Sequence, residues 1–144
     1  MQAMVKRIGI DKLGLVGRAE SGHWLPMDTS VAGDGHAAAN SPMEMVLLAL
    51  GGCTAMDVLS ILKKKRVTLD DIEVAIDADR ADTHPRIFTA IRLTYHFYGA
   101  GLVPSDLEQA VTLSQEKYCS VAGMLRGAVE LSHAIEIHPS RAGS

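Results

Sequence analysis

Aromatic side chains are scarce in this sequence: they make up 4% of 144 residues, within a hydrophobic content of 47%. A surface that stacks nucleobases needs several exposed aromatic rings. The composition argues against such a surface and predicts a core built from aliphatic side chains. A chain of this length can bury roughly two-thirds of the surface that its unfolded form exposes. We therefore expect a single domain over residues 1–144.

Positive charge is also in short supply, because 14 lysines and arginines face 17 acidic residues and the net charge is −3. Nucleic-acid binding depends on clustered cations that neutralise phosphates, so no nucleic-acid partner is expected. The basic run at residues 63–66 ends a predicted helix, where cations complement the helix dipole.

Long apolar runs are missing as well. The first residues lack the apolar centre of a signal peptide, and we see no uninterrupted run near the ~20 residues that a membrane span needs. We expect a cytoplasmic protein without a membrane partner. Its two cysteines, Cys53 and Cys119, should then be kept reduced. A permanent disulfide is disfavoured in that compartment, whereas a transient catalytic one stays open.

Recognisable metal and cofactor motifs are absent from the sequence. The glycine-rich stretches lack the spacing of a phosphate-binding or dinucleotide-binding loop. The histidines show no HxxxH spacing and the cysteines no CxxC spacing, so we expect neither a zinc site built on Cys53 or Cys119 nor a bound cofactor. The six histidines are His23, His36, His84, His96, His133 and His138.

What is present predicts an α+β fold. Turn residues punctuate short apolar runs over residues 4–28, which indicates hairpins, and a loop follows over 28–40. Ser41, Pro42 and Glu44 form a helix-start signature in which Ser41 is the N-cap and Glu44 its capping-box partner. Apolar residues at three- and four-residue spacing continue this helix to about residue 65.

The second half of the chain alternates strands and helices. Strict apolar and polar alternation predicts strands at 71–79 and 87–98, paired antiparallel. A helix capped by Ser105 should extend to about residue 117, a short helix should begin near Cys119, and a last strand should cover 129–138. In that strand, the predicted inward residues are Val129, Leu131, His133, Ile135 and Ile137.

Gly51 and Gly52 precede Cys53 inside the long helix, where two glycines cost on the order of 2 kcal/mol relative to alanines. They would let another backbone, a ligand or a partner helix approach the thiol closely. The alternative is a buried cysteine in a tight helix crossing. Cys119, at a helix start, should favour the thiolate. Asp57, one turn after Cys53, would oppose ionisation of that thiol unless the carboxylate is itself paired.

The segments SPMEMVLLALGGCTAMDVLSILKKKR and EKYCSVAGML resemble the OsmC/Ohr family of osmotically induced and organic-hydroperoxide-resistance proteins, and look closest to its YhfA-type branch. The resemblance covers nearly the whole chain. It implies an OsmC-like α+β fold with antiparallel sheets around a long helix, an intertwined homodimer, and thiol-dependent reduction of organic or lipid hydroperoxides. Cys53 then looks like the peroxidatic residue and Cys119 like the resolving one, and an external dithiol, of the lipoyl type, would reduce their disulfide.

The resemblance leaves the groups around the thiolate open. Peroxidase branches place a Glu directly after the helix-starting Pro and pair it with an Arg; here Met43 takes that position and Glu44 follows. Glu44 can therefore be a catalytic carboxylate or only a capping partner. Arg18 in the early strands is the candidate for this arginine, and the alternatives are Arg80, Arg86 and Arg92. The alternative functions are a non-catalytic redox-sensing or ligand-binding protein, and an interaction protein with two core thiols.

Overall fold

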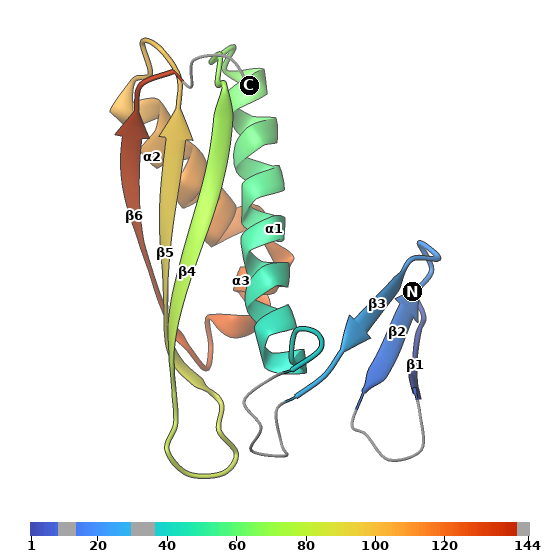
Figure 1. Ribbon diagram of the computed structural model, residues 1–144. Helices are drawn as coiled ribbons and strands as arrows, with labels where there is room; N and C mark the ends of the chain where they lie inside the picture. The colour runs from blue at the N-terminus through green and yellow to red at the C-terminus, as the bar shows by residue number, and fades with distance from the viewer. Residues whose placement is uncertain (9–13, 30–36, 141–144) are drawn as a thin grey trace. The chain divides into compact units, whose positions relative to one another are not determined.

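The computed structural model describes residues 1–8, 14–29 and 37–140 (Figure 1). The chain forms two compact units, Met1–Leu48 and Ala49–Ser144.

The first unit contains a three-stranded antiparallel sheet, which confirms the predicted hairpins. Its strands are β1 (Ala3–Arg7), β2 (Leu15–Ala19) and β3 (Trp24–Met27), in the order β1-β2-β3. Gly22 has a φ of 84° in the turn between β2 and β3, a conformation that glycine adopts without steric cost. The loop predicted over residues 28–40 lies partly outside the described residues.

Helix α1 (Pro42–Lys64) begins and ends close to where the sequence predicts. Its start is a capping box. The Ser41 backbone N–H donates to Glu44 Oε2 at 2.6 Å, and the Glu44 N–H donates to Ser41 Oγ at 3.3 Å. This reciprocal pair satisfies N–H groups that the first turn cannot bond internally, and it lowers the pKa of Glu44 because its carboxylate accepts from Ser41.

Among the described residues, α1 is the one helix whose length and composition would allow it to cross a membrane. We did not expect this from the sequence, because charged and polar residues interrupt its apolar runs. A core helix of a water-soluble protein has the same properties, and the chain has a soluble-type fold. Only 28% of the most apolar stretch of α1 is buried. Exposed apolar side chains on its surface include Met56 and Leu59.

The second unit is built on the sheet β4-β5-β6. Strands β4 (Asp71–Arg80) and β5 (Phe88–Tyr98) pair antiparallel, as predicted. The last strand, β6 (Glu130–His138), instead pairs parallel to β5, so the expectation of purely antiparallel sheets is wrong for this strand. The two helices and the π-turn between β5 and β6 form a crossover that returns the chain to the same end of the sheet, which is the connection that parallel strands need.

The crossover consists of α2 (Pro104–Leu113), a π-helical turn η1 (Ser114–Tyr118) and α3 (Ser120–Leu125). Figure 1 shows α2 running behind β5 and β6. Ser105 is not the N-cap of α2: Val103 takes that place and Pro104 fills the first helical position, where its missing N–H leaves no bond unmade. The predicted α-helix ends four residues early because the chain widens into the π-turn.

The hydrophobic core of this unit is formed by side chains from one face of β5, from α1 and from the helices of the crossover. In β6 the predicted inward residues Leu131, His133 and Ile135 are half-buried, whereas Ile137 is exposed. The fully buried aliphatic and aromatic side chains of the unit, each at most 1% exposed, include Leu50, Val58, Leu62, Ile91, Leu93, Tyr95, Phe97, Leu107 and Val111.

Candidate functional site

Both cysteines lie in the second unit and face each other. Cys53 belongs to α1, and Cys119 is the residue directly before α3. Their sulfur atoms and a carboxylate oxygen of Asp57 all lie within 4.8 Å of one another. Both thiols are free, Cys53 half-buried and Cys119 buried. The disulfide that the family resemblance implies requires the long helix and the turn at residue 119 to meet, and in the structure they do.

Cys119 is the N-cap of α3, and its Sγ accepts a hydrogen bond from the Ala122 N–H at 3.4 Å. The sequence predicts a stabilised thiolate here, but the structure contradicts that prediction. Burial, as the largest cause, and the hydrogen bond of its thiol with Cys53 together raise the pKa of Cys119 to about 11, because the N–H groups of Ala122 and Val121 offset only part of their effect. Desolvation of the anion outweighs the helix start. Cys119 therefore holds its proton at neutral pH.

The two glycines beside Cys53 have different surroundings. Gly51 is buried, and a methyl group added to it would lie 2.8 Å from Cδ1 of Ile76 in β4. Close packing at Gly51 is therefore explained by a side chain of the same unit, and not by another backbone, a ligand or a partner helix. Gly52 is exposed, and an added methyl would meet no described atom within 4 Å outside its own helix turn. Space for a partner remains only at Gly52.

A chain of buried hydrogen bonds ends at Asp57. Thr54 Oγ1 lies 2.7 Å from Tyr95 Oη and 2.8 Å from Ser114 Oγ. Gln115 Nε2 donates to Tyr95 Oη at 2.8 Å, and Ser114 Oγ donates to Asp57 Oδ2 at 3.2 Å. An amide NH₂ can only donate and a carboxylate can only accept. Ser114 Oγ donates its one proton to Asp57 or, at 3.5 Å, to the Thr54 carbonyl. It must therefore accept from the Thr54 hydroxyl, which in turn accepts from Tyr95.

The hydroxyl of Ser114 gives the Asp57 carboxylate a hydrogen-bond partner. An unpaired Asp57 was expected to oppose ionisation of the Cys53 thiol, and this hydrogen bond meets the need for a partner. Burial raises the pKa of Tyr95, so its phenol stays protonated and available as a donor. Sequence inspection missed Thr54, Tyr95, Ser114 and Gln115. Their common signal is polar groups on otherwise buried faces, which is visible only once the inward face of each element is known.

The surroundings of the two thiols predict different reactivities. We expect iodoacetamide at pH 8 to alkylate Cys53 before Cys119, because alkylation requires an accessible thiolate and Cys119 is 4% exposed with a pKa of about 11. Labelling of Cys119 should rise only as pH approaches 11 or when the protein unfolds. Time-resolved peptide mass spectrometry measures both rates. Faster labelling of Cys119 at pH 8 would contradict the arrangement.

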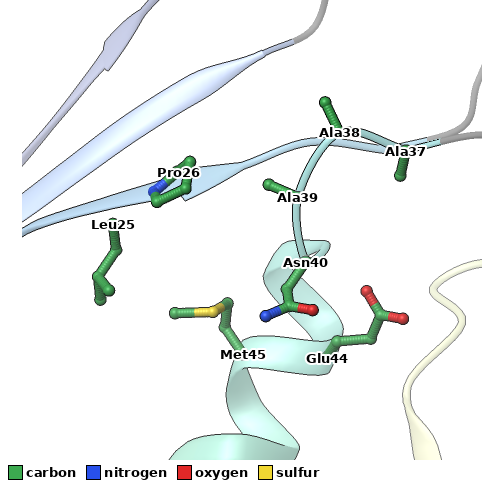
Figure 2. A pocket seen from close by; sticks show the side chains of 8 residues that line it. All are labelled: Leu25, Pro26, Ala37, Ala38, Ala39, Asn40, Glu44 and Met45. Carbon is green, nitrogen blue, oxygen red and sulfur yellow. The ribbon is translucent and has the colours of Figure 1, made fainter.

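Arg18 and Glu44, the other predicted site residues, lie in the first unit. The Arg18 guanidinium stacks over the Trp24 ring at 5.0 Å, and Lys6 lies over the same ring at 4.8 Å. Glu44 is the capping partner of Ser41, as the preferred interpretation of the helix start requires. Glu44 also lines a hollow of about 500 Å³, seen in Figure 2, together with Leu25, Pro26, Ala37, Ala38, Ala39, Asn40 and Met45.

Two of the competing arginines have other partners. Arg92 forms ion pairs with Asp77 and, at 2.8 Å, with Asp79 on the exposed face of the β4-β5 pair. Arg80 donates from Nε to the Arg86 carbonyl at 2.9 Å and lies over the Phe88 ring. Arg80 and Arg92 therefore have partners on the surface of the sheet, and none of these contacts is with a thiol.

A second hollow of about 500 Å³ lies beside the thiols, since Asp57 forms part of its wall. Ile61, Leu113 and Tyr118 provide the apolar part of its wall. The remaining wall residues are polar: Ser60, Lys64, Lys65 and Gln109.

Two groups of side chains in the described residues have donor atoms close enough to hold a metal ion. One is Cys53, Asp57 and Cys119, and the other is His96, Glu136 and His138. Motif spacing in the sequence predicted neither, because each group comes from elements far apart in the chain.

Known proteins resemble this chain over most of its length, both in sequence and in fold. The family model described as OsmC-like protein matches residues 33–134. Protein YhfA of Escherichia coli strain K12 is 45% identical over 137 residues, which is 95% of this chain and 98% of YhfA. A crystal structure of a hypothetical protein from Aquifex aeolicus VF5 has a TM-score of 0.83 at 28% identity and covers 97% of both chains. The organic hydroperoxide resistance protein OhrB of Bacillus subtilis has the same fold, with a TM-score of 0.66 at 14% identity over 94% of this chain and 98% of that one.

Proposed function

Because the chain belongs to the OsmC-like family, we propose that it is a thiol-dependent peroxidase that reduces organic or lipid hydroperoxides in the cytoplasm. The observation that carries this proposal is the pairing of a half-buried thiol with a buried one, their sulfur atoms within 4.8 Å of each other. Proximity of this kind lets two cysteines be oxidised together. The family resemblance supplies the substrate class, and OhrB carries hydroperoxide resistance in its name.

The reaction proceeds in three balanced steps. The Cys53 thiolate attacks the terminal peroxide oxygen, the O–O bond breaks, and the alkoxide leaves with a proton as the alcohol; Cys53 becomes a sulfenic acid. The Cys119 thiol then displaces the hydroxyl as water, and a disulfide forms. An external dithiol, of the lipoyl type, donates two electrons and two protons and restores both thiols.

The raised pKa of Cys119 changes the basis for these roles. A thiol that holds its proton is a poor first nucleophile and a poor leaving group, so leaving-group ability does not favour Cys119 as the resolving residue. Exposure does: Cys53 is the more accessible sulfur, and the Cys119 thiol can donate its hydrogen bond to a Cys53 thiolate. That donation would stabilise the nucleophile in the first step.

Arg18 and Glu44 stay in the proposal as the cation and carboxylate that would orient the Cys53 thiolate. These roles rest on the family resemblance alone. The contacts within the first unit are with Trp24 for Arg18 and with Ser41 for Glu44.

We also propose that two copies of the chain associate through α1. Gly52, Met56 and Leu59 follow one another at helical spacing on one exposed face, and Met56 is 73% exposed. An apolar stripe of this kind marks an interaction surface. A second copy is the partner that the intertwined dimers of the family suggest, and it would use the open space at Gly52.

Turnover with a dithiol tests the peroxidase proposal. Reduced protein with excess dihydrolipoamide should consume many equivalents of cumene hydroperoxide, and a Cys53→Ser/Cys119→Ser double variant should consume none above the uncatalysed rate. Stoichiometric oxidation without turnover would instead support the alternative, a redox-sensing or ligand-binding protein. The capping-box use of Glu44 is the observation that favours this alternative.

We expect the peroxidase to prefer bulky organic hydroperoxides over hydrogen peroxide. The hollow beside Asp57 has an apolar side formed by Ile61, Leu113 and Tyr118, and burial of an apolar group there contributes to binding. The measurement compares kcat/KM for cumene hydroperoxide and hydrogen peroxide, with a ratio of at least ~10 expected. Leu113→Asn should reduce this ratio. A preference for hydrogen peroxide would contradict the prediction.

A further inference from the structure

Two histidines and a glutamate meet on the face of the β5-β6 pair that points away from the core. Glu136 and His138 are two residues apart on β6, so their side chains share one face. His96 on β5 is the register partner of Glu136, and Tyr98 is the partner of His138. The intervening residues of β5, Tyr95 and Phe97, are fully buried on the opposite face. The cluster therefore lies on the other side of the sheet from the thiols.

The donor atoms of this cluster form a nearly equilateral triangle. His96 Nδ1 lies 3.1 Å from His138 Nε2 and 3.1 Å from Glu136 Oε2, and the third side, from His138 Nε2 to Glu136 Oε2, is 3.6 Å. Ligands at the ~2.0–2.1 Å distances typical of zinc, placed at tetrahedral corners, are about 3.3–3.4 Å apart. We propose that His96, Glu136 and His138 form a binding site for a divalent transition-metal ion, with Zn²⁺ as the best match.

Hydrogen bonding alone accounts less well for this triangle. Within the triangle, His96 Nδ1 is the atom closest to both others, so a single N–H there would have to serve two acceptors. If His138 Nε2 carries the proton instead, the lone pair of His96 Nδ1 faces a carboxylate oxygen at 3.1 Å. A metal cation removes this conflict, because it accepts all three lone pairs at once. Two imidazoles and one carboxylate are also a donor set that zinc, cobalt and nickel accept.

Neighbouring groups hold the ligands in place and favour a cation. The Tyr98 ring stacks on His138 at 4.8 Å, and the His96 and His138 rings stack at 5.3 Å. Glu73 is the register partner of His96 on β4, and its Oε2 accepts from the Tyr98 hydroxyl at 3.2 Å. A second carboxylate is thereby held beside the site, and its negative charge favours a cation there.

The site is open to solvent. The side chains of His96, His138 and Glu136 are 23%, 33% and 54% exposed. A metal can enter directly, and three protein ligands leave a fourth tetrahedral position for water or for a small anion. This arrangement differs from a closed structural site, in which four protein ligands surround the ion.

Calorimetric titration of Zn²⁺ into the tag-free protein tests the proposal. The titration uses a Cys53→Ser/Cys119→Ser background, which removes the thiols as competing ligands. One ion per chain should bind, and His96→Ala or His138→Ala should weaken binding by at least ~10-fold to 100-fold. Glu136→Gln, which keeps the side-chain shape, should also weaken it. The matched control is His133→Ala on the same strand, whose imidazole pairs with Glu108 at 2.8 Å and packs edge-on against the Tyr95 ring; it should leave the affinity unchanged.

Spectra of the cobalt-substituted protein provide a second measurement. Co²⁺ bound by His96, Glu136 and His138 should give the intense visible bands of a four-coordinate ion, and His138→Ala should abolish them while the circular dichroism of the variant stays that of the folded protein. The proposal is overturned if the background protein binds no Zn²⁺ at tens of micromolar. It is equally overturned if the His96 and His138 variants bind the ion as tightly as the His133 control.

Discussion

Cys53→Ser should abolish hydroperoxide reduction, with a fall in kcat/KM of at least ~10³-fold, because the variant loses the nucleophile itself. Cys119→Ser should behave differently. Its Cys53 can still attack the peroxide, but no second sulfur lies within 4.8 Å to displace the hydroxyl from the sulfenic acid. One equivalent of organic hydroperoxide should therefore form a Cys53–Cys119 disulfide in the wild type and stop at a sulfenic acid on Cys53 in Cys119→Ser.

Mass spectrometry after dimedone trapping distinguishes these products, with thiol counts on the wild type and both single variants. Each oxidised wild-type chain should lose both free thiols and carry no dimedone. A sulfenic acid on Cys119 in the Cys53→Ser protein, together with an inert Cys53 in the converse variant, would reverse the two roles. Two unreactive thiols would leave only a structural part for both cysteines.

The substitutions Gly51→Leu and Gly52→Leu should have different effects: the first should lower stability and the second should weaken association. At Gly51 the first added carbon already lies 2.8 Å from Cδ1 of Ile76, so the branched side chain overpacks the contact between α1 and β4. We expect the free energy of unfolding to fall by about 1–3 kcal/mol or more. At Gly52 the added side chain has room within its own chain and gains helix propensity of about 0.8 kcal/mol. Its effect should fall on association of two copies.

Urea unfolding and sedimentation over a concentration series separate the two effects. Unfolding has to be compared at one protein concentration, because dimer dissociation lowers apparent stability by mass action. Gly52→Ala is the control that keeps the surface nearly flat and should preserve the dimer. A wild-type protein that sediments as a monomer at micromolar concentration would remove the dimer proposal, and a Gly52→Leu protein that dimerises normally would remove Gly52 from the interface.

The elements that local patterns determine were the ones the sequence predicted well. The capping box at Ser41 and Glu44, the alternation in β4 and β5, and the short helix after Cys119 all depend on residues within one turn or one strand. The meeting of Cys53 with Cys119 was also predicted. That inference needed the family resemblance, since 65 residues separate the two cysteines and no local spacing connects them.

Features that depend on tertiary environment were not predictable in the same way. The pKa of Cys119 is one example, because burial raises it by more than the N–H groups at the helix start lower it. The parallel pairing of β6 depends on the crossover that separates it from β5, and this pairing brings His96 to Glu136. A search for histidines at helical spacing cannot find ligands on neighbouring strands. The π-turn at Ser114–Tyr118 leaves no signal that we can identify in its sequence.

The position of the two cysteines in the chain also has a thermodynamic consequence for the oxidised protein. A bond between Cys53 and Cys119 would close a loop of roughly 65 residues, and loop-closure entropy predicts that such a link destabilises the unfolded chain by about 4 kcal/mol. The folded protein would favour its disulfide by the same amount, which corresponds to roughly 90 mV in reduction potential for a two-electron couple. Regeneration of the thiols therefore calls for a strongly reducing partner. Each catalytic cycle would alternate between a reduced form that is less stable against unfolding and an oxidised form that is more stable.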